Sequence, residues 1–339
     1  MSFLTEKMID KEVLKYFHNL TPTSIFPSLA EKALGRINKI GFPDRKSENW
    51  KYTKLSKIYK RNFTDPKSSD LKFFPKTKLP NISASTIVIE NGRLNKHLTC
   101  IDDVDGLEIS FFSSNNSAIS DQINHTVFKF EDAFTDLNTY LLNEGVYIKV
   151  KENIKISQPI QVVNIVTSPG IMVNSRLNLE LGKSAELTVL QSFIGDDSSS
   201  SFVNHVSEAY LADNSILNID KHQDYDGVIN FVSEYIHQDS NSSFTINTFS
   251  YSGQLIRNGL NVNVSGENCH TELNGVFTVS GDDYIDNHTL VNHLEPNCQS
   301  HENYKGIIKD KGVGVFNGKV IVHKDAQKIY AFQNNNNVL

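Results

Sequence analysis

Apolar residues in the first sixty positions recur at spacings of three and four, which is the period of one face of a helix. A stripe at 13–20 predicts a first helix. A second helix is predicted from Ser28 onwards, because Ser28 and Glu31 form a capping-box pattern and Gly41 follows the apolar stripe. The same period predicts one later helix at Asp132–Asn143. We therefore expect a helical N-terminal region over 1–60.

The composition changes between residues 61 and 85, where Lys, Ser, Asp and Pro are frequent and turn-forming residues occur throughout. This stretch is predicted to be a linker. A short strand at Thr86–Glu90 and the helix at Asp132–Asn143 then indicate a mixed strand and helix segment over 86–145. Trp50 is the only Trp of the chain, and we expect it to pack between the N-terminal helices and the rest of the molecule.

Beyond Gly145 the helical period disappears, and runs of alternating polar and apolar residues take its place. Turns rich in Gly, Asn, Asp and Ser separate these runs. The predicted strands are Gln161–Val166, Leu177–Leu181, Leu187–Phe193, Val206–Leu211, Ile216–Lys221, Val228–His237, Phe244–Tyr251, Leu260–Val264, Glu272–Val279, Tyr284–Asn292, Tyr304–Lys309, Val315–Val322 and Lys328–Phe332. No helical pattern of useful length interrupts them, so a sheet built from helical crossovers is not expected.

The turns between these strands recur at a nearly constant step. Taking Ser184, Ser215, Asn241, Asn268 and Asn297 as turn centres gives steps of about 26 to 31 residues. Such a step is typical of a solenoid with two long strands in each coil. A β-sandwich is the alternative, but its turns have no reason to keep a fixed step. We predict a mainly β protein, with a right-handed parallel β-helix over 146–339 behind the helical region.

Composition narrows the class of protein. Of the 339 residues 39% are hydrophobic and 21% charged, as in folded proteins, and the formal net charge of −6 argues against a nucleic-acid partner. No apolar run approaches the roughly 18 residues that span a bilayer, and no secretory signal pattern is visible. Three cysteines are too few for a disulfide scaffold. We expect a cytoplasmic protein without a membrane or nucleic-acid partner.

The densest group of possible ligands lies in one predicted turn near the C-terminal end. It contains imidazole, carboxylate and thiol groups, which iron and zinc accept, at His293, Glu295, Cys298 and His301. If strand alternation continues, His293 and Glu295 point to the same face. Stacking of the coils would also bring Cys269 near Cys298. The four residues are therefore candidate iron contacts, and the alternative is a turn stabilised by its own polar side chains.

Two pairs of neighbouring acidic residues fit a different chemistry. Asp196–Asp197 and Asp282–Asp283 could serve a β-helix polysaccharide lyase or hydrolase with a bound cation. Their structural alternative is a role in turns, where Asp is common. The chain has no Gly-x-Ser-x-Gly nucleophile motif. On chemistry alone, the sequence names no reaction.

The stretch VNHLEPNCQSHENYKGI at 291–307 resembles the signature of the SufD branch of the SufB/SufD iron–sulfur cluster assembly family. VFNGKV at 315–320 and DAQKIYAFQNNN at 325–336 continue the similarity. ENWKYT at 48–53 is similar to a segment near the start of family members. Phe193 stands where SufB-type members carry a Cys, which favours the SufD branch.

The resemblance implies a right-handed β-helix behind a helical region and a non-catalytic subunit that pairs with SufB and with the SufC ATPase. Pairing with SufB is expected to join sheet edges. No firmly bound cofactor is implied. Iron or an iron–sulfur cluster is expected only transiently, at the level of the complex, with this subunit helping to bring in iron and assemble the cluster.

Family members continue past the Asn-rich segment into a short C-terminal helical region that docks SufC, with a Cys-x-His element near it. The present sequence ends at Leu339, before both features. We therefore expect a chain truncated before the family's C-terminal helical region, without the SufC-docking segment. The last coil would then end in the middle of the strand pattern.

Overall fold

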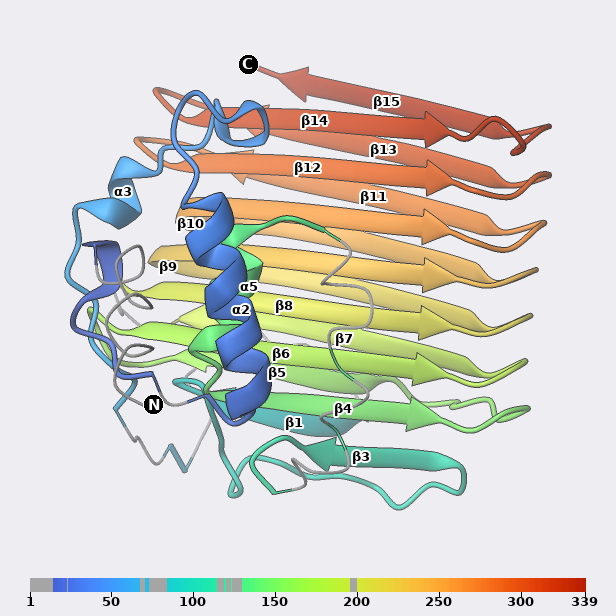
Figure 1. The fold of residues 1–339 in the computed structure, drawn as a ribbon, viewed down its shortest axis with the longest axis horizontal. Helices are drawn as coiled ribbons and strands as arrows, with labels where there is room; N and C mark the ends of the chain where they lie inside the picture. Colours follow the sequence, from blue (N-terminus) through green and yellow to red (C-terminus); the bar gives the residue numbers. More distant parts are fainter. Residues whose placement is uncertain are drawn as a thin grey trace, which may run out of the picture.

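The computed structural model describes residues 15–22, 24–67, 71–72, 84–114, 119, 123, 130–195 and 200–339. These residues form a β-helix of about seven turns with a helical segment packed against one face (Figure 1). The predicted architecture, mainly β with an N-terminal helical region, is confirmed. The first helix predicted at 13–20 lies partly outside the described residues.

Helix α2 (Pro27–Ile40) starts differently from the prediction. Pro27 is its first residue, Ser28 lies inside it, and no side chain caps it, so the capping box expected at Ser28 and Glu31 is wrong. Pro is well suited to the first helical position, because its φ is already helical and the N–H it lacks would have no partner there. The predicted end is confirmed, since Gly41 follows the helix with a φ of 70°.

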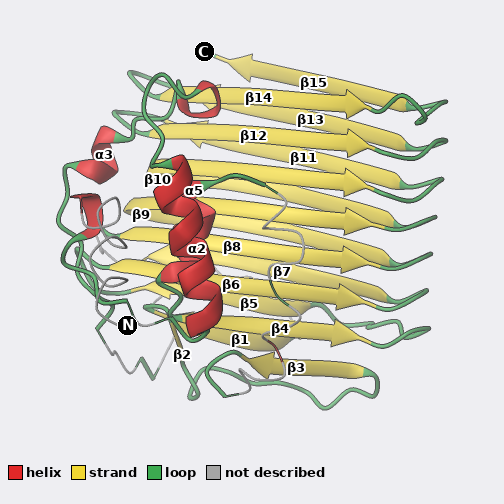
Figure 2. Cartoon of the chain, viewed as in Figure 1, coloured by secondary structure: helices red, strands yellow, loops and turns green. Residues whose placement is uncertain are grey.

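The other helices are shorter. The 3-10 helix η1 (Glu48–Trp50) and helix α3 (Ser56–Tyr59) follow α2 along the chain. Helix α5 (Ala133–Tyr140) begins after Asp132, whose carboxylate accepts a hydrogen bond of 2.9 Å from the backbone N–H of Phe134. Figure 2 shows α2 and α5 together on one face of the strand stack.

The described strands are β1 (Ser85–Glu90), β2 (Arg93–Leu94), β3 (Leu107–Phe111), β4 (Glu144–Val150), β5 (Ile160–Val166), β6 (Met172–Leu181), β7 (Glu186–Gly195), β8 (Phe202–Leu211), β9 (Ile216–Gln238), β10 (Ser243–Val264), β11 (His270–Val279), β12 (Tyr284–His293), β13 (Gln299–Ile308), β14 (Val313–Val322) and β15 (Tyr330–Val338).

Two columns of parallel strands make the β-helix. One column runs β1-β5-β7-β9-β10-β11-β13-β15, and the other runs β4-β6-β8-β9-β10-β12-β14. Strands β9 and β10 belong to both columns, because each continues around the corner of its coil. Register partners lie one coil apart, as in the series Ser243, His270, Gln299 and Tyr330. This parallel register confirms the predicted solenoid and excludes the sandwich.

The turns repeat the same backbone conformation in each coil. Residues at the turn position have a positive φ of 57° to 61°, and they are Ser184, Asn214, Asn241, Asn268 and Asn297. Four of the five predicted turn centres are confirmed, and Asn214 replaces the predicted Ser215. Asn tolerates the left-handed region better than most residues, which explains its use here.

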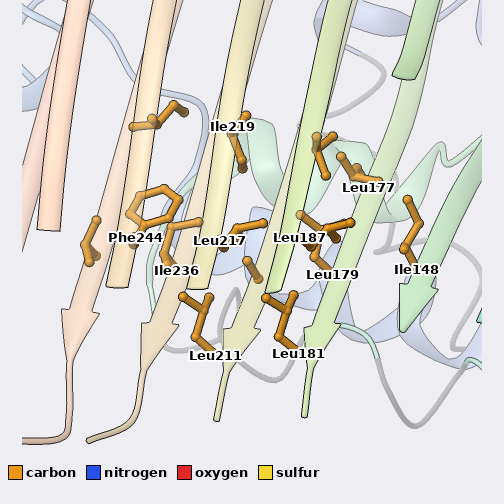
Figure 3. Packing of buried hydrophobic residues seen from close by; sticks show 14 of the residues in the cluster. Ile148, Leu177, Leu179, Leu181, Leu187, Leu211, Leu217, Ile219, Ile236 and Phe244 are labelled. Carbon is orange, nitrogen blue, oxygen red and sulfur yellow. The ribbon is translucent and has the colours of Figure 1, made fainter. Parts of the chain in front are cut away.

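The hydrophobic core fills the inside of the coils next to these turns. Side chains from successive strands meet there, as Figure 3 shows for Leu187, Leu217, Ile219 and Phe244. The first half of β9 alternates buried and half-buried residues, whereas β6 and β8 are buried on both faces over nearly their whole length. The outer face of β8 is covered by the helical segment, with Phe202 packed into its core.

Candidate functional site

The turn between β12 and β13 carries the four candidate iron contacts. Strand β12 ends at His293, which is fully buried inside the coil, and Cys298 is also fully buried just before β13. Glu295 is exposed on the turn itself. His301 lies on the outer surface of β13, where its ring stacks on Phe332 at 5.1 Å. The structure therefore brings two of the four inside and leaves two outside.

The expectation that His293 and Glu295 share a face is wrong. Alternation of side chains holds only while the backbone remains extended. Because β12 ends at His293, the residues that follow form a turn and Glu295 faces solvent. The predicted approach of Cys269 to Cys298 is confirmed, since both Sγ atoms lie 3.3 Å from the carbonyl oxygen of Gly266.

The coil repeat places the two cysteines one above the other. Each follows a turn residue of positive φ, Asn268 or Asn297, and immediately precedes a strand. The small residues Ala185, Ser215 and Ser242 occupy the same inward position in earlier coils, and all are buried. The next two coils carry thiols at this position, and the coil after them carries the half-buried Ile329.

The two thiols have different surroundings. Cys269 Sγ has three carbonyl acceptors, those of Asp239 at 3.1 Å, Gly266 at 3.3 Å and Glu267 at 3.7 Å. The hydrogen bond with Cys298 and burial raise the pKa of the Cys269 thiol. The hydrogen bond from Cys269 and the adjacent His293 imidazole lower the pKa of the Cys298 thiol, against the effect of burial. Cys298 Sγ also faces two backbone carbonyl oxygens, those of Gly266 and Pro296, each at 3.3 Å.

His293 completes this interior group. Its Nε2 lies 3.0 Å from Ser300 Oγ, and its Nδ1 is buried with no hydrogen-bond partner in the described structure. Polar side chains continue beyond the thiols, since Ser242 Oγ is 3.7 Å from Cys269 Sγ and Thr271 donates a hydrogen bond of 2.6 Å to the Gln238 side chain. The interior of this coil end is thus polar around an imidazole and two thiols.

The outer surface carries a second, separate group. His270 Nε2 lies 3.0 Å from Glu272 Oε1, and the rings of His270 and His301 are 5.9 Å apart. Within the part of the chain that the structure describes, no group of three or more His, Cys, Asp or Glu residues is placed to hold a metal ion. The interior thiols and His293 are therefore suitable ligand types that are not arranged as a preformed metal site in the described structure.

A buried ionic cluster fixes the N-terminal segment to the β-helix, and sequence reasoning found only its aromatic member. Arg257 on β10 places its guanidinium 3.9 Å from the centre of the Trp50 ring and bonds Asp286 on β12 at 2.7 Å. Thr53 also donates a hydrogen bond to Asp286. Burial opposes ionisation of Asp286, but the hydrogen bond from His288 and the charge of Arg257 lower the pKa of its carboxyl. The predicted packing role of Trp50 is confirmed.

A second buried ion pair lies inside the coil, where Lys221 and Glu234 on β9 are 2.5 Å apart and each is 1% exposed. Strand alternation alone predicts the inward position of Lys221. Lys221 has the same parity in its strand as Leu217 and Ile219, so alternation places it inward with them.

Of the two acidic pairs considered for a polysaccharide lyase or hydrolase, the structure describes only one. Asp196–Asp197 lies outside the described residues. Asp282–Asp283 lies in the turn between β11 and β12, where Asp283 N–H donates to the carbonyl of Ser280. Lys57 donates a hydrogen bond of 3.1 Å to the carbonyl of Asp282. These contacts are those of a turn held against the N-terminal segment.

Comparison with known proteins adds the family. The profile of the SufBD core domain of the SUF system for FeS cluster assembly matches residues 164–339, and that of the SufBD N-terminal region matches residues 18–162. The chain belongs to the SufBD family. Membership links it to iron–sulfur cluster assembly by the Suf system. The resemblance seen in the sequence is thereby confirmed.

Relatives of the SufBD family match most of the chain at low identity. Iron-sulfur cluster assembly protein SufD of Escherichia coli is 25% identical over 324 residues, which cover 91% of this chain and 73% of that protein. A SufBD family iron-sulfur cluster assembly protein of Synechocystis is 24% identical over 362 residues, covering 99% and 80%. One from Mycobacterium leprae is 22% identical over 199 residues, covering 57% and 50%. Among the described helices of this SufBD protein, none combines the length and apolar character needed to cross a membrane.

Proposed function

We propose that the chain is a non-catalytic subunit of a cytoplasmic Suf assembly complex, where it pairs with a SufB-like subunit and works with a SufC-like ATPase. The observation that carries the proposal is the match to both SufBD regions, which together span residues 18–162 and 164–339. The stiff stack of parallel coils supports a scaffold role, because it offers long regular surfaces to a partner of similar build.

Iron and the growing cluster are cargo in this proposal. The chain helps to bring in iron and to assemble the cluster, and contacts between protein and iron are transient and belong to the complex. The interior thiols and His293 supply the ligand types that such contacts need.

Co-expression of the tagged chain with the SufB-like and SufC-like subunits of the same genome tests the pairing. We expect a stable complex by size-exclusion chromatography with light scattering, and a lower yield of anaerobically reconstituted cluster when the chain is omitted. A well-folded chain that elutes alone beside both subunits contradicts the proposal. Anaerobic iron titration of the complex, with a His293→Ala variant for comparison, tests the role in bringing in iron; equal uptake by both argues against His293 as a contact.

A further inference from the structure

Cys269 and Cys298 meet inside the β-helix although they are separated by one whole coil of sequence. They immediately precede His270 and Gln299, which are register partners on β11 and β13. Neighbouring parallel strands lie about 4.7 to 4.9 Å apart, which falls within the Cα separations that a disulfide spans. Both Sγ atoms lie 3.3 Å from one carbonyl oxygen, that of Gly266. Turn residues precede both cysteines, so the backbone there can adjust.

We propose that Cys269 and Cys298 are a redox pair, which a hydroperoxide converts to a reversible disulfide between consecutive coils. Cys298 is assigned as the attacking thiol, because it shares the β12–β13 turn with His293, whose buried Nδ1 has no hydrogen-bond partner in the described structure and is the nearby base available to take a thiol proton. Cys269 is assigned as the resolving thiol, because three backbone carbonyl oxygens surround its Sγ against two around the Sγ of Cys298.

The chemistry balances in two steps. The Cys298 thiolate attacks one oxygen of hydrogen peroxide, the O–O bond breaks, and sulfenic acid and hydroxide form. Cys269 sulfur then attacks the sulfenic sulfur, the S–O bond breaks, and the hydroxyl leaves as water with the thiol proton. The two sulfurs lose two electrons in total, and the peroxide gains them. A dithiol reductant reverses the change by thiol exchange.

The oxidant must reach thiols that have essentially no exposed surface. They lie directly beneath turns, since their neighbours Glu267, Asn268, Glu295 and Asn297 are exposed. A turn must open locally to admit hydrogen peroxide, and such local opening is easier for exposed turns than for paired strands. Oxidation is therefore expected to be slower than at the exposed Cys100, but to end in a disulfide.

The test uses the full chain with Cys100→Ser, which leaves only the two interior thiols. After treatment with hydrogen peroxide in the presence of a chelator, the protein is denatured, alkylated and analysed by intact mass and peptide mapping. We expect the loss of two hydrogen atoms, the loss of both alkylation sites, a cross-linked peptide joining Cys269 and Cys298, and full reversal by dithiothreitol.

Three further variants test the separate roles of Cys269, Cys298 and His293. Cys269→Ser in the Cys100→Ser background should yield Cys298 sulfenic acid that a dimedone probe traps, and Cys298→Ser should leave Cys269 reduced. His293→Gln should slow disulfide formation at least tenfold. The proposal is overturned if both interior thiols remain alkylatable while Cys100 of the unmodified chain is fully oxidised, or if the product is an intermolecular disulfide. Both of these outcomes can be measured on the unmodified chain alone. The proposal can therefore be refuted even if a variant fails to fold.

Discussion

Lys221 and Glu234 form an ion pair inside the coil, and each side chain is only 1% exposed. Each charge therefore depends on the other for stabilisation, because water cannot solvate it. Replacing Lys221 by Met leaves a buried carboxylate without a counter-charge, so we expect unfolding free energy to fall by about 3–5 kcal/mol. The double variant Lys221→Met with Glu234→Leu should recover most of this loss. Urea unfolding followed by circular dichroism measures both values.

The exposed pair Lys155 and Glu186 provides the matched control. Lys155→Met should cost less than about 1 kcal/mol, because solvent screens a surface pair. A Lys221→Met variant that is no less stable than Lys155→Met would show that the interior of this coil is hydrated.

His205 makes a pH-dependent contribution from the same interior. Burial and the charges of Lys221 and Arg176 lower its pKa to about 3, whereas the unfolded chain binds that proton near pH 6.5. Between these values the unfolded state holds more protons, so acid favours unfolding. We expect His205 alone to remove about 2 kcal/mol of stability between pH 6.5 and pH 5.

The comparison of wild type with His205→Gln isolates the contribution of His205 to the loss of stability in acid. Gln keeps hydrogen-bonding capacity toward Ser175 and Ser207 but does not titrate. Urea unfolding at both pH values should show a smaller acid loss in the variant. His237→Gln on the outer surface is the control, and an equal pH dependence in all three proteins would refute the assignment.

At the scale of elements, the N-terminal segment depends on one buried cluster. Arg257→Met leaves Asp286 buried without its counter-charge and removes the cation from the Trp50 ring. We expect the segment around η1 to loosen by about 3–5 kcal/mol in local opening free energy. Hydrogen exchange should therefore accelerate in peptides covering 44–60 and remain unchanged in β9.

Arg61→Met is the control for this element. Arg61 also joins the N-terminal segment to β10, but its partner is the neutral side chain of Gln254 at 2.6 Å. Its loss breaks a hydrogen bond without stranding a buried charge, so a smaller change is expected. Equal exchange in the Arg257 and Arg61 variants would mean that aromatic packing, rather than the ion pair, holds the segment.

The sequence predicted the strands and turns more successfully than the positions of single residues in the candidate site. Strand alternation and the constant step of the turns are properties that repeat in every coil, so a solenoid could be inferred from many weak observations. Single sites lack such averaging. The start of α2 depended on whether the helix begins at Pro27 or is capped by Ser28. The side on which Glu295 lies depended on the residue at which β12 ends. The interior position of Lys221 followed from parity but contradicts the usual exposure of Lys.

At the scale of the whole molecule, the two outer faces of the β-helix differ. Helices α2 and α5 lie on the face that includes β6 and β8 (Figure 1). On the face formed by β10, β11 and β13, three large apolar side chains are more than two-fifths exposed: Tyr251, Val276 and Ile307. Val276 and Thr278 lie on the same side of β11, and Thr278 is the register partner of Ile307 on β13. Val276 and Ile307 are therefore close on this face. Next to them is a hollow of about 230 Å³ bordered by Phe249 and Val276 and by polar residues that include Asn274, Asn303 and Lys305.

The exposed apolar side chains favour this face, rather than the sheet edges expected from the resemblance, as the binding surface for the proposed SufB-like partner, because apolar side chains at the centre of a patch contribute most to protein interfaces. Val276→Asp should weaken the complex at least tenfold, which corresponds to about 1.4 kcal/mol, since it replaces an apolar contact by a carboxylate that must lose its water on binding, with only Lys305 of β13 beside it. Val104→Asp is the matched control, because Val104 is 37% exposed beside 42% for Val276 and lies before β3, away from this face. Titration calorimetry with the purified partner measures both, with circular dichroism confirming that the variants remain folded. If the two variants bind equally well, the partner uses another surface, and sheet edges become the remaining means of pairing.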